Sequence, residues 1–426
     1  MLGKVVVSII CSLLWNSNVS ASPNNPSGTH NPTHSHKQEG HQQNAATLLW
    51  SSAWYSPIDS KGGALEPQSL RQRIRSSIDG KKVRLQFSNK FGTSALKMTS
   101  VMIARSDGLG AIDLKSQRPV LFAGSNNVVI PPGQEIVSDS IDLPVKALEE
   151  LAISFFLPEG TETATLHNTS MQNAQLYPLV DKTRSKTWGE AKQDDTRYFL
   201  KELEIQTSGK TGAIVAFGDS LTDGVGIEND RYHRWTDFLA ERLQVSPKHR
   251  QYAVLNAGIA GNRLLRGASA PFIGNAGLLR FDEDVLQRAG VQFIIVSIGT
   301  NDISANHAFS DPSEQITYED LVDGYQQLIT RAHERSIKII GTTIKPRGGA
   351  QGRLPHTPEA ERLRIRINQW IRSASAFDGV IDFDLMLRDP AQVDRLNPIY
   401  DSGDHTHPNA AGYRVMANGI DLRLFQ

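Results

Sequence analysis

The chain has 426 residues, with 45 basic and 45 acidic side chains, so its formal net charge at neutral pH is zero. A balanced charge excludes a global attraction to nucleic acid or to an anionic membrane surface. A chain of this length is long enough to form two ordinary domains, each with a core of its own.

The N-terminal segment, residues 1–21, has the layout of a secretory signal peptide. A single lysine precedes an apolar stretch from Val5 to Trp15, and a Val-Ser-Ala sequence ends at Ala21. The apolar stretch is too short to anchor the chain across a bilayer, and no later apolar run is long enough to do so. We therefore expect cleavage after Ala21 and a secreted or periplasmic product. Cleavage removes Cys11, the only cysteine, and so excludes disulfides, thiol catalysis and thiolate metal ligands.

Residues 22–46 hold almost no apolar side chains that could build a core, which is typical of a disordered leader or tether. Four histidines in this segment raise the alternative of a loose metal site. No second cluster of ligands is close in the sequence, so a solvated linker is the favoured interpretation. The four residues are His30, His34, His36 and His41.

Residues 47–205 carry the signals of β-strands. In the segment KKVRLQFSN, apolar and polar residues alternate, with Val83, Leu85 and Phe87 on one face of the expected strand. The segments NNVVIPPGQEIV and LAISFFL indicate further strands, separated by turns rich in proline and glycine. Because no convincing long helix occurs, we predict an antiparallel β-sandwich domain of the jelly-roll kind.

Three tryptophans of this region, Trp50, Trp54 and Trp188, raise the question of a carbohydrate-binding surface. An exposed indole ring can stack on a sugar ring, but its large apolar area also suits the core or the edge of a sandwich. Packing is the favoured interpretation, and carbohydrate binding by this domain stays open.

From residue 210 to the C-terminus, strand and helix signals alternate. The runs AIVAF, YAVLN, QFIIVSI, IKIIGTTI and GVIDFD are rich in valine and isoleucine, as expected of buried strands. Between them, residues 231–244 and 318–334 place apolar side chains on one helix face. Thr357 and Pro358 begin another helix, as its cap and its first residue. This order predicts right-handed βαβ units and a parallel sheet with helices on both faces.

Four polar segments follow predicted strands or lie in the last loop of this region: GDSLTDG, NAGIAGN, GTND and DHTHP. Parallel sheets bind ligands beyond the carboxyl ends of their strands, so the four segments can converge on one site. Together they supply a hydroxyl nucleophile, an imidazole base, a carboxylate to orient the base, and hydrogen-bond donors for an oxyanion. Acyl transfer requires this combination of groups.

The DHTHP segment also allows a rival chemistry. Asp404, His405 and His407, with Asp401 nearby, could bind a hard metal ion. Two histidines separated by one residue can chelate an ion when they lie on a strand. A metal-dependent hydrolase at this loop is therefore kept as an alternative.

The four segments, in this order, resemble the sequence blocks of the SGNH (GDSL) hydrolase superfamily. The longer stretches VLNAGIAGNRLLR and YDSGDHTHPNAAGY are similar to a secreted acylesterase branch associated with xylanase clusters, which carries an N-terminal β-domain. The resemblance implies a flavodoxin-like parallel sheet flanked by helices, the SGNH hydrolase fold. The expected order along the chain is a signal peptide (1–21), a leader (22–46), a β-sandwich domain (47–205) and a catalytic domain (210–426).

The resemblance implies roles for five residues. Ser220 is the nucleophile, His407 is the general base, and Asp404 is the carboxylate that orients the imidazole. The backbone amides of Ser220 and Gly261 and the side-chain amide of Asn301 hold the oxyanion. No cofactor or metal ion takes part in such a mechanism.

The resemblance assigns other residues of the same segments no part in proton transfer. Asp219 is expected to hold the turn before the nucleophile. His405 has no role, because the Asp-x-x-His spacing of the family selects His407. Thr300 stands where the third block of the family has a glycine, and this departure leaves Asn301 in place.

The implied function is that of an exported serine esterase that removes short acyl groups, with acetyl as the expected one. Its substrate would be an acetylated polysaccharide, an oligosaccharide or another small ester. A catalytically inactive carbohydrate-binding protein and an acyltransferase with the same triad stay open as alternatives. The loops at residues 263–279, 303–317 and 346–361 are expected to shape the substrate pocket.

Overall fold

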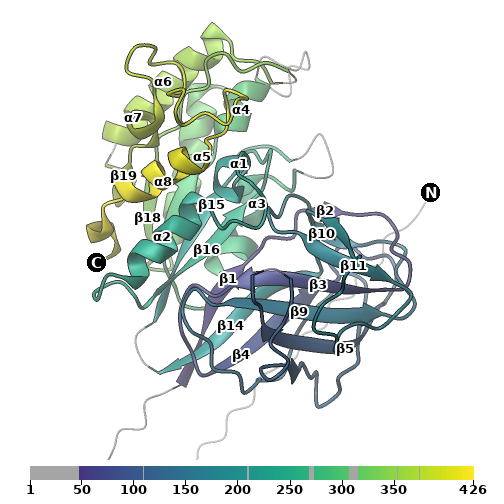
Figure 1. Ribbon diagram of the computed structural model, residues 1–426. Coiled ribbons are helices and arrows are strands. Elements are labelled where there is room, and N and C mark those ends of the chain that lie inside the picture. Colours follow the sequence, from purple (N-terminus) through teal and green to yellow (C-terminus); the bar gives the residue numbers. More distant parts are fainter. Residues whose placement is uncertain are drawn as a thin grey trace, which may run out of the picture. The chain divides into compact units, whose positions relative to one another are not determined.

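Figure 1 shows the computed structural model of the chain, which describes residues 48–108, 110–208, 211–267, 273–306, 315–352, 354–373 and 375–426. The expected signal peptide and the histidine-containing leader lie outside the described residues. The described residues all belong to one compact unit. Within this unit we call residues 48–208 the β region and residues 211–426 the α/β region.

The β region consists of antiparallel strands in three sheets. One sheet has the order β1-β14-β4-β8, a larger one has the order β12-β11-β3-β9-β5-β6 with β7 paired to β5, and a short one has the order β13-β10-β2. This arrangement confirms the predicted antiparallel class. The strands are β1 (Leu48–Tyr55), β2 (Ser60–Lys61), β3 (Gln68–Arg75), β4 (Lys82–Ser88), β5 (Leu96–Arg105), β6 (Arg118–Pro119), β7 (Val128–Ile130), β8 (Glu135–Val137), β9 (Glu150–Leu157), β10 (Thr165–His167), β11 (Ala174–Pro178), β12 (Lys192–Asp194), β13 (Arg197–Tyr198) and β14 (Leu200–Ser208).

Strand β4 shows how the sequence pattern produces the core of this region. Val83, Leu85 and Phe87 are fully buried, whereas the residues between them are partly exposed, as the alternation predicts. Phe87 packs edge-to-face on Phe155 of β9, with the ring centroids 5.8 Å apart. Burying each such side chain contributes about 1.5–3 kcal/mol to folding. Alternation along single strands therefore fixes which face of each sheet points inward.

The three tryptophans all pack against arginine side chains. Trp188 is buried, and its indole N–H donates to the Lys182 carbonyl at 2.9 Å. Arg71 lies over the Trp188 ring, Arg84 over that of Trp50 and Arg197 over that of Trp54, at 4.5, 4.5 and 5.2 Å from the ring centroids. These contacts agree with the packing interpretation, since Trp188 is a core residue and guanidinium groups cover the other two rings from one side.

The α/β region is built on a five-stranded sheet with the order β16-β15-β17-β18-β19. All of its pairings are parallel. The order along the sheet is the one found in flavodoxin-like folds, so the predicted fold class is confirmed. The strands are β15 (Gly212–Gly218), β16 (Tyr252–Gly258), β17 (Val291–Ser297), β18 (Lys338–Thr342) and β19 (Gly379–Ile381).

Helices cover both faces of this sheet (Figure 1). Ile214 and Ala216 of β15 share a core with helices α2, α7 and α8, whereas Val215 and Phe217 share a core with α5 and α6. The helices are α1 (Ser220–Asp223), α2 (Trp235–Gln244), α3 (Gly277–Phe281), the π-helical turn η1 (Asp282–Leu286), α4 (Thr300–Ala305), α5 (Tyr318–His333), α6 (Pro358–Ser373), α7 (Phe383–Leu387), α8 (Ala410–Gly419) and the 3-10 turn η3 (Leu422–Phe425).

The predicted helix over residues 231–244 is wrong in its first turn, because α2 begins only at Trp235. Tyr232 has a φ of +53°, which a right-handed helix does not allow. Its hydroxyl donates to Glu150 of β9 at 2.5 Å, and Arg75 stacks on its ring. The start of the helical pattern is therefore used for a contact with the β region.

The predicted start of α6 is confirmed. Its first residue is Pro358, and the Thr357 hydroxyl accepts a hydrogen bond from the Ala360 amide at 3.1 Å. A threonine cap followed by proline satisfies one amide and removes another at a helix end where amides lack intrahelical partners.

Candidate active site

The carboxyl ends of strands β15, β16 and β17 lie in contact, as the sequence predicts. The Ile259 amide donates to the Gly218 carbonyl at 3.2 Å, and the Asp219 amide donates to the Ser297 carbonyl at 3.3 Å. A Cβ atom on Gly258 would lie 2.3 Å from the Asp223 nitrogen, so only glycine permits this approach. The segments that carry Ser220, Gly261 and Asn301 therefore start from neighbouring points of one sheet edge.

Ser220 is the first residue of helix α1, and Asp219 caps that helix. The Asp219 carboxylate accepts a hydrogen bond from the Leu221 amide at 3.0 Å, which agrees with the turn-holding role expected of it. Burial raises the pKa of Asp219 above its usual range, while the Leu221 amide and the charge of Lys345 oppose that change. The amide of Ser220 lies in the first turn, where helical N–H groups have no intrahelical acceptor.

Three of the sequence-predicted residues form a continuous hydrogen-bonded row. His407 Nε2 lies 2.8 Å from Ser220 Oγ, and His407 Nδ1 lies 2.6 Å from Asp404 Oδ2. The other oxygen of Asp404 accepts the backbone amides of Thr406 and His407, at 2.8 and 2.7 Å. Partial burial favours the neutral carboxyl, but the hydrogen bonds from His407 and these amides outweigh it and lower the pKa of Asp404 well below its usual range.

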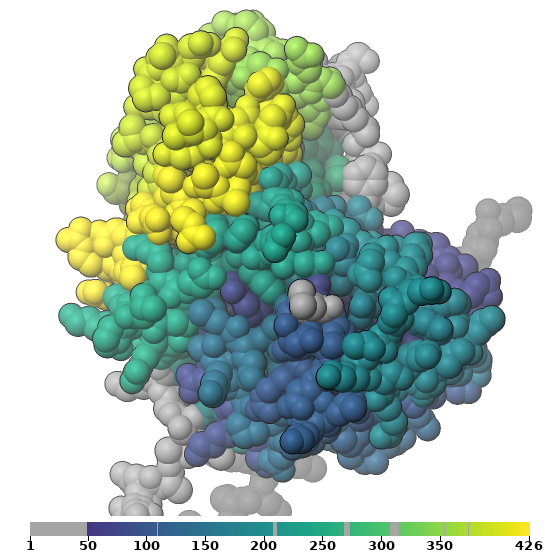
Figure 2. All heavy atoms as spheres, in the orientation of Figure 1, coloured from purple at the N-terminus to yellow at the C-terminus, as the bar shows by residue number. Residues whose placement is uncertain are grey.

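The loop that carries His407 packs against the segment after α1. A Cβ on Gly226 would lie 2.6 Å from the Pro408 carbonyl oxygen and 3.0 Å from the His407 Cβ, and its φ is +100°, so glycine is required there. The Tyr413 hydroxyl of α8 donates to the Val225 carbonyl at 2.6 Å. In Figure 2 the C-terminal part of the chain (yellow) lies directly against teal atoms, the colour of residues near 200–250.

His405 belongs to a different pair. Its Nδ1 lies 2.6 Å from the carboxylate of Asp401, and its side chain is largely exposed. Asp404 and His407 face each other instead, so the three side chains of the metal-site alternative do not converge. Among the described residues, no group of three or more His, Cys, Asp or Glu side chains is arranged to hold a metal ion.

The two further oxyanion candidates lie on one short loop and on the helix beside it. Gly261 has a φ of +78°, and a Cβ there would come within 2.5 Å of the Ile273 side chain, which explains the glycine. Asn301, near the start of α4, donates from Nδ2 to the Asn262 carbonyl at 3.0 Å. The side-chain amide of Asn301 and the loop that holds Gly261 are thus in direct contact.

The sequence analysis missed the buried groups that fix this loop. Asp302 accepts the amides of Leu264 and Leu265 at 2.7 and 3.0 Å, and burial raises the pKa of its carboxyl to about 6 against these hydrogen bonds. The fully buried Asn262 side chain accepts a hydrogen bond from Arg280 at 2.9 Å. Asp302 and Asn262 are parts of the GTND and NAGIAGN segments, so their position in those segments was the available signal.

A buried lysine beside the site was also missed. Lys345 follows β18 at the same sheet edge and is 2% exposed. Burial lowers the pKa of its ammonium, and the nearby charge of Arg347 lowers it further, whereas Asp219 and Asp404 act in the opposite direction. The site therefore contains basic side chains as well as the carboxylates that the sequence suggested.

The three loops expected to shape the substrate pocket are only partly described. Residues 268–272, 307–314 and 353 lie outside the described residues, so the prediction about the pocket walls stays a prediction.

A family model places the α/β region among known proteins. Residues 216–415 match the model of the GDSL-like lipase/acylhydrolase family. This match contains the five site residues predicted from the sequence, and it leaves out the β region. None of the described helices is both long and apolar enough to cross a membrane.

The solved structures similar to this chain include the following three. A protein of the G-D-S-L family from Desulfitobacterium hafniense is 19% identical, over 49% of this chain and 97% of its own, with a TM-score of 0.35. An acetyl xylan esterase is 20% identical, over 49% and 96%, with a TM-score of 0.36. A carbohydrate acetylesterase from Sinorhizobium meliloti is 15% identical, over 49% and 95%, with a TM-score of 0.37. No curated protein matches the chain significantly.

The parallel sheet, the sequence blocks at its carboxyl edge and the family match over residues 216–415 agree with one another. Through this region the chain belongs to the SGNH (GDSL) hydrolase superfamily, and it is a carboxylic ester hydrolase.

Proposed function

We propose that this hydrolase is a serine esterase in which Ser220 is the nucleophile, His407 the general base and Asp404 the group that orients His407. The observation that carries the proposal is the unbroken row of hydrogen bonds at 2.8 and 2.6 Å through the imidazole ring. A hydroxyl on one ring nitrogen and a carboxylate on the other is the arrangement that activates a serine.

The reaction proceeds in two halves. Ser220 Oγ attacks the ester carbonyl carbon, while its proton passes to His407 Nε2 and a tetrahedral oxyanion forms. The oxyanion collapses to an acyl-serine, and His407 returns the proton to the leaving alcohol. Water then attacks the acyl group with His407 again as the base, which releases the acid and restores Ser220. Asp404 holds the proton on Nδ1 and stabilises the imidazolium in both halves.

The oxyanion is held by the backbone amides of Ser220 and Gly261 and by the side-chain amide of Asn301. Helix α1 presents the Ser220 amide at its N-terminus, where the helix dipole also favours negative charge. The Asn301 amide has two N–H groups, and its bond to the Asn262 carbonyl uses one of them. The second N–H is then available to the oxyanion.

A chelator and a serine reagent test this proposal against the metal-dependent alternative. Turnover of an aryl acetate should survive EDTA and should stop with a serine-directed phosphonate, with the label on Ser220. Activity that disappears in EDTA and returns with zinc would overturn the proposed triad.

We propose further that the substrate is a short-chain ester, with an acetylated carbohydrate as the natural one. Support comes from the resemblance of VLNAGIAGNRLLR and YDSGDHTHPNAAGY to acylesterases associated with xylanase clusters. A panel of acetylated xylan, acetylated monosaccharides and aryl esters of rising chain length tests it. Turnover should fall as the acyl chain lengthens, and faster turnover of long-chain lipid esters would contradict the proposal.

We also propose that the enzyme is exported and processed after Ala21, because the first residues have the layout of a signal peptide. N-terminal sequencing of the protein from an exporting host should give Ser22 as the first residue. Intact residues 1–21 on an enzyme that stays in the cytoplasm would contradict export.

A further inference from the structure

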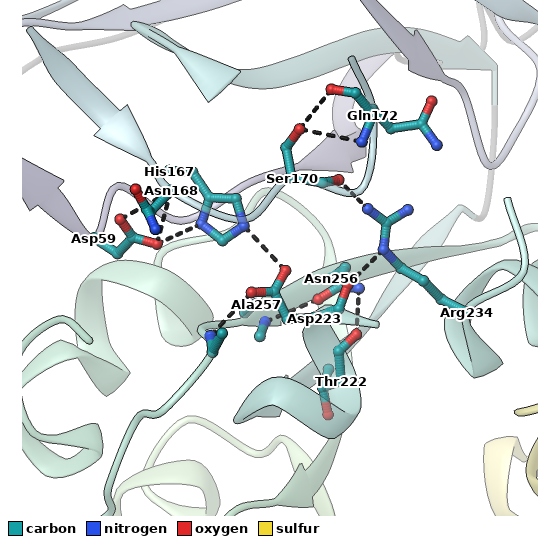
Figure 3. Close-up of polar contacts among 12 residues, drawn as sticks. Asp59, His167, Asn168, Ser170, Gln172, Thr222, Asp223, Arg234, Asn256 and Ala257 are labelled. Atoms are coloured by element: carbon teal, nitrogen blue, oxygen red, sulfur yellow. Dashed lines mark hydrogen bonds and ion pairs between the residues drawn. The ribbon is translucent and has the colours of Figure 1, made fainter. Parts of the chain in front are cut away.

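A buried histidine of the β region contacts the helix that begins with Ser220. His167 is the last residue of strand β10, and Figure 3 shows its ring between two carboxylates. Its Nδ1 lies 2.8 Å from Asp59, beside β2 in the same sheet, and its Nε2 lies 3.0 Å from Asp223, the last residue of α1. A row of three side chains therefore joins the β region to α1.

The row consists of two buried ion pairs that share His167. The side chains of Asp59, His167 and Asp223 are each at most 4% exposed. Burial alone would lower the pKa of His167, but the charges of Asp223 and Asp59 and their hydrogen bonds outweigh it and raise the pKa to about 10. The imidazole is therefore a cation at neutral pH, with its Nε2 hydrogen-bonded to Asp223 and its Nδ1 in ionic contact with Asp59.

Asp223 also contacts the loop that carries Gly261. Its second oxygen accepts the backbone amide of Ala260 at 2.9 Å, and Ala260 immediately precedes Gly261. The Asp223 carbonyl accepts a hydrogen bond from Arg234 at 2.6 Å, and the same guanidinium donates to the Ser170 carbonyl of the β region (Figure 3). The end of α1 is thus fixed to the β region through its carboxylate and through its backbone.

The loop itself is a tight turn held at two points. The Asn262 amide donates to the Ile259 carbonyl at 3.1 Å, which closes the turn around Gly261. Asn301 binds the Asn262 carbonyl on one side of Gly261, and Asp223 binds the Ala260 amide on the other. We therefore expect a change in the position of Asp223 to move the Gly261 amide relative to Ser220.

We propose that His167 is a positioning residue for the oxyanion hole: through Asp223 it fixes the Ala260–Gly261 peptide, so that the β region completes the active site. The inference rests on the proposed function, because it assumes that the Gly261 amide binds the oxyanion. His167 does not touch the substrate. It places one of the donors that the transition state requires, and such placement affects turnover more than substrate binding.

The chain offers a matched control for this proposal. Lys201 of β14 is also a buried cation between a carboxylate of the β region and one of the α/β region. Its Nζ lies 2.7 Å from Glu135 and 3.0 Å from Glu283 of η1. Glu283 pairs with Lys90 as well, and neither of these lysines shares a hydrogen bond or ion pair with Asp223.

The experiment compares His167→Gln with Lys201→Gln on an aryl acetate. Each change replaces a buried cation by a neutral amide and removes the cation that two carboxylates share, so both variants should melt earlier than the wild type. Only His167→Gln should lose about tenfold to a hundredfold in kcat, with KM within about twofold of wild type, because a displaced donor acts on the transition state. Hydrogen exchange at residues 259–262 should become faster in His167→Gln alone.

Wild-type kcat in folded His167→Gln, or the same loss in both variants, would overturn the proposal. Where His167→Gln does not fold, Asp59→Asn takes its place, since it weakens the hold on His167 without touching Asp223, and a kcat loss of at least about threefold is expected. Ser220→Ala is measured in parallel. An active Ser220→Ala would refute the proposed function itself, whereas an inactive Ser220→Ala beside a fully active His167→Gln would refute only the role of His167.

Discussion

Two histidines contact helix α1, one at each end, and their different partners give them different chemistry. His407 faces the hydroxyl of Ser220, the first residue of the helix, and one carboxylate, that of Asp404. His167 faces Asp223, the last residue, and a second carboxylate, that of Asp59.

The partner on Nε2 decides what each imidazole can do. His167 holds its proton between two negative charges, with a pKa of about 10, so it serves as a fixed cation. His407 has a neutral hydroxyl in the corresponding place, and its ring is partly exposed beside Ser220. A ring in that setting can take up the serine proton and release it again. In the proposed mechanism the partner on Nε2, and not the Asp–His pair, separates the general base from a structural cation.

The largest expected effect is the loss of the base. His407→Ala should reduce kcat by about 10⁴-fold or more, because a triad member acts as one unit with the nucleophile. The melting temperature should change little, since the ring lies in an open, partly exposed loop. Steady-state kinetics and a thermal melt of the same preparation check both statements.

His405→Ala is the matched control in the same loop. The His405 ring pairs with Asp401, whereas the His407 ring binds Ser220 and Asp404, so the variant should keep a substantial fraction of turnover. Equal collapse of both variants in folded protein would mean that the wrong histidine of this loop has been assigned as the base.

The next largest effect is expected for Asn301→Ala. This variant distinguishes an oxyanion donor from an amide with only a structural role. As a donor Asn301 pairs with charge that develops fully only in the transition state. Asn301→Ala should then lower kcat by about a hundredfold to a thousandfold, while KM moves little. A variant that melts early but turns over normally would show that its bond to the Asn262 carbonyl is its whole role.

The two ends of α1 also differ in how far the sequence reveals them. Asp404 and His407 are close in sequence and belong to segments that resemble family blocks, so both were predicted together with Ser220. Alternation in β4 and the valine-rich runs of the parallel sheet revealed the fold in the same local way.

Asp59, His167 and Asp223 come from three distant parts of the chain, and no spacing relates them. Their proximity depends on how β2 and β10 pair and on how the β region packs against α1. Tyr232 shows the same limit, since the helical pattern around it gives no sign of its contact with Glu150. Local periodicity and motifs predicted the strands and the candidate site residues, whereas nothing in the sequence predicted these long-range ionic contacts.

The smallest expected effect is a pH-dependent change in stability that sharpens the contrast between the two histidines. The pKa of His167 is raised to about 10 in the folded protein, against about 6.5 in the unfolded chain. The groups that face its ring are the carboxylates of Asp59 and Asp223. A raised pKa stabilises the fold fully at pH values below the pKa of the unfolded chain. This contribution is lost as pH rises through the pKa of the folded protein.

Between pH 7 and pH 10 the wild type should therefore lose stability more steeply than His167→Gln, and the gap between their melting temperatures should narrow by on the order of a few degrees. Groups titrating in both proteins cancel in that gap, so thermal melts of the two at several pH values isolate the histidine. A gap that stays constant would mean that His167 is neutral in the folded protein, and the distinction drawn here between a fixed cation and a catalytic base would fail.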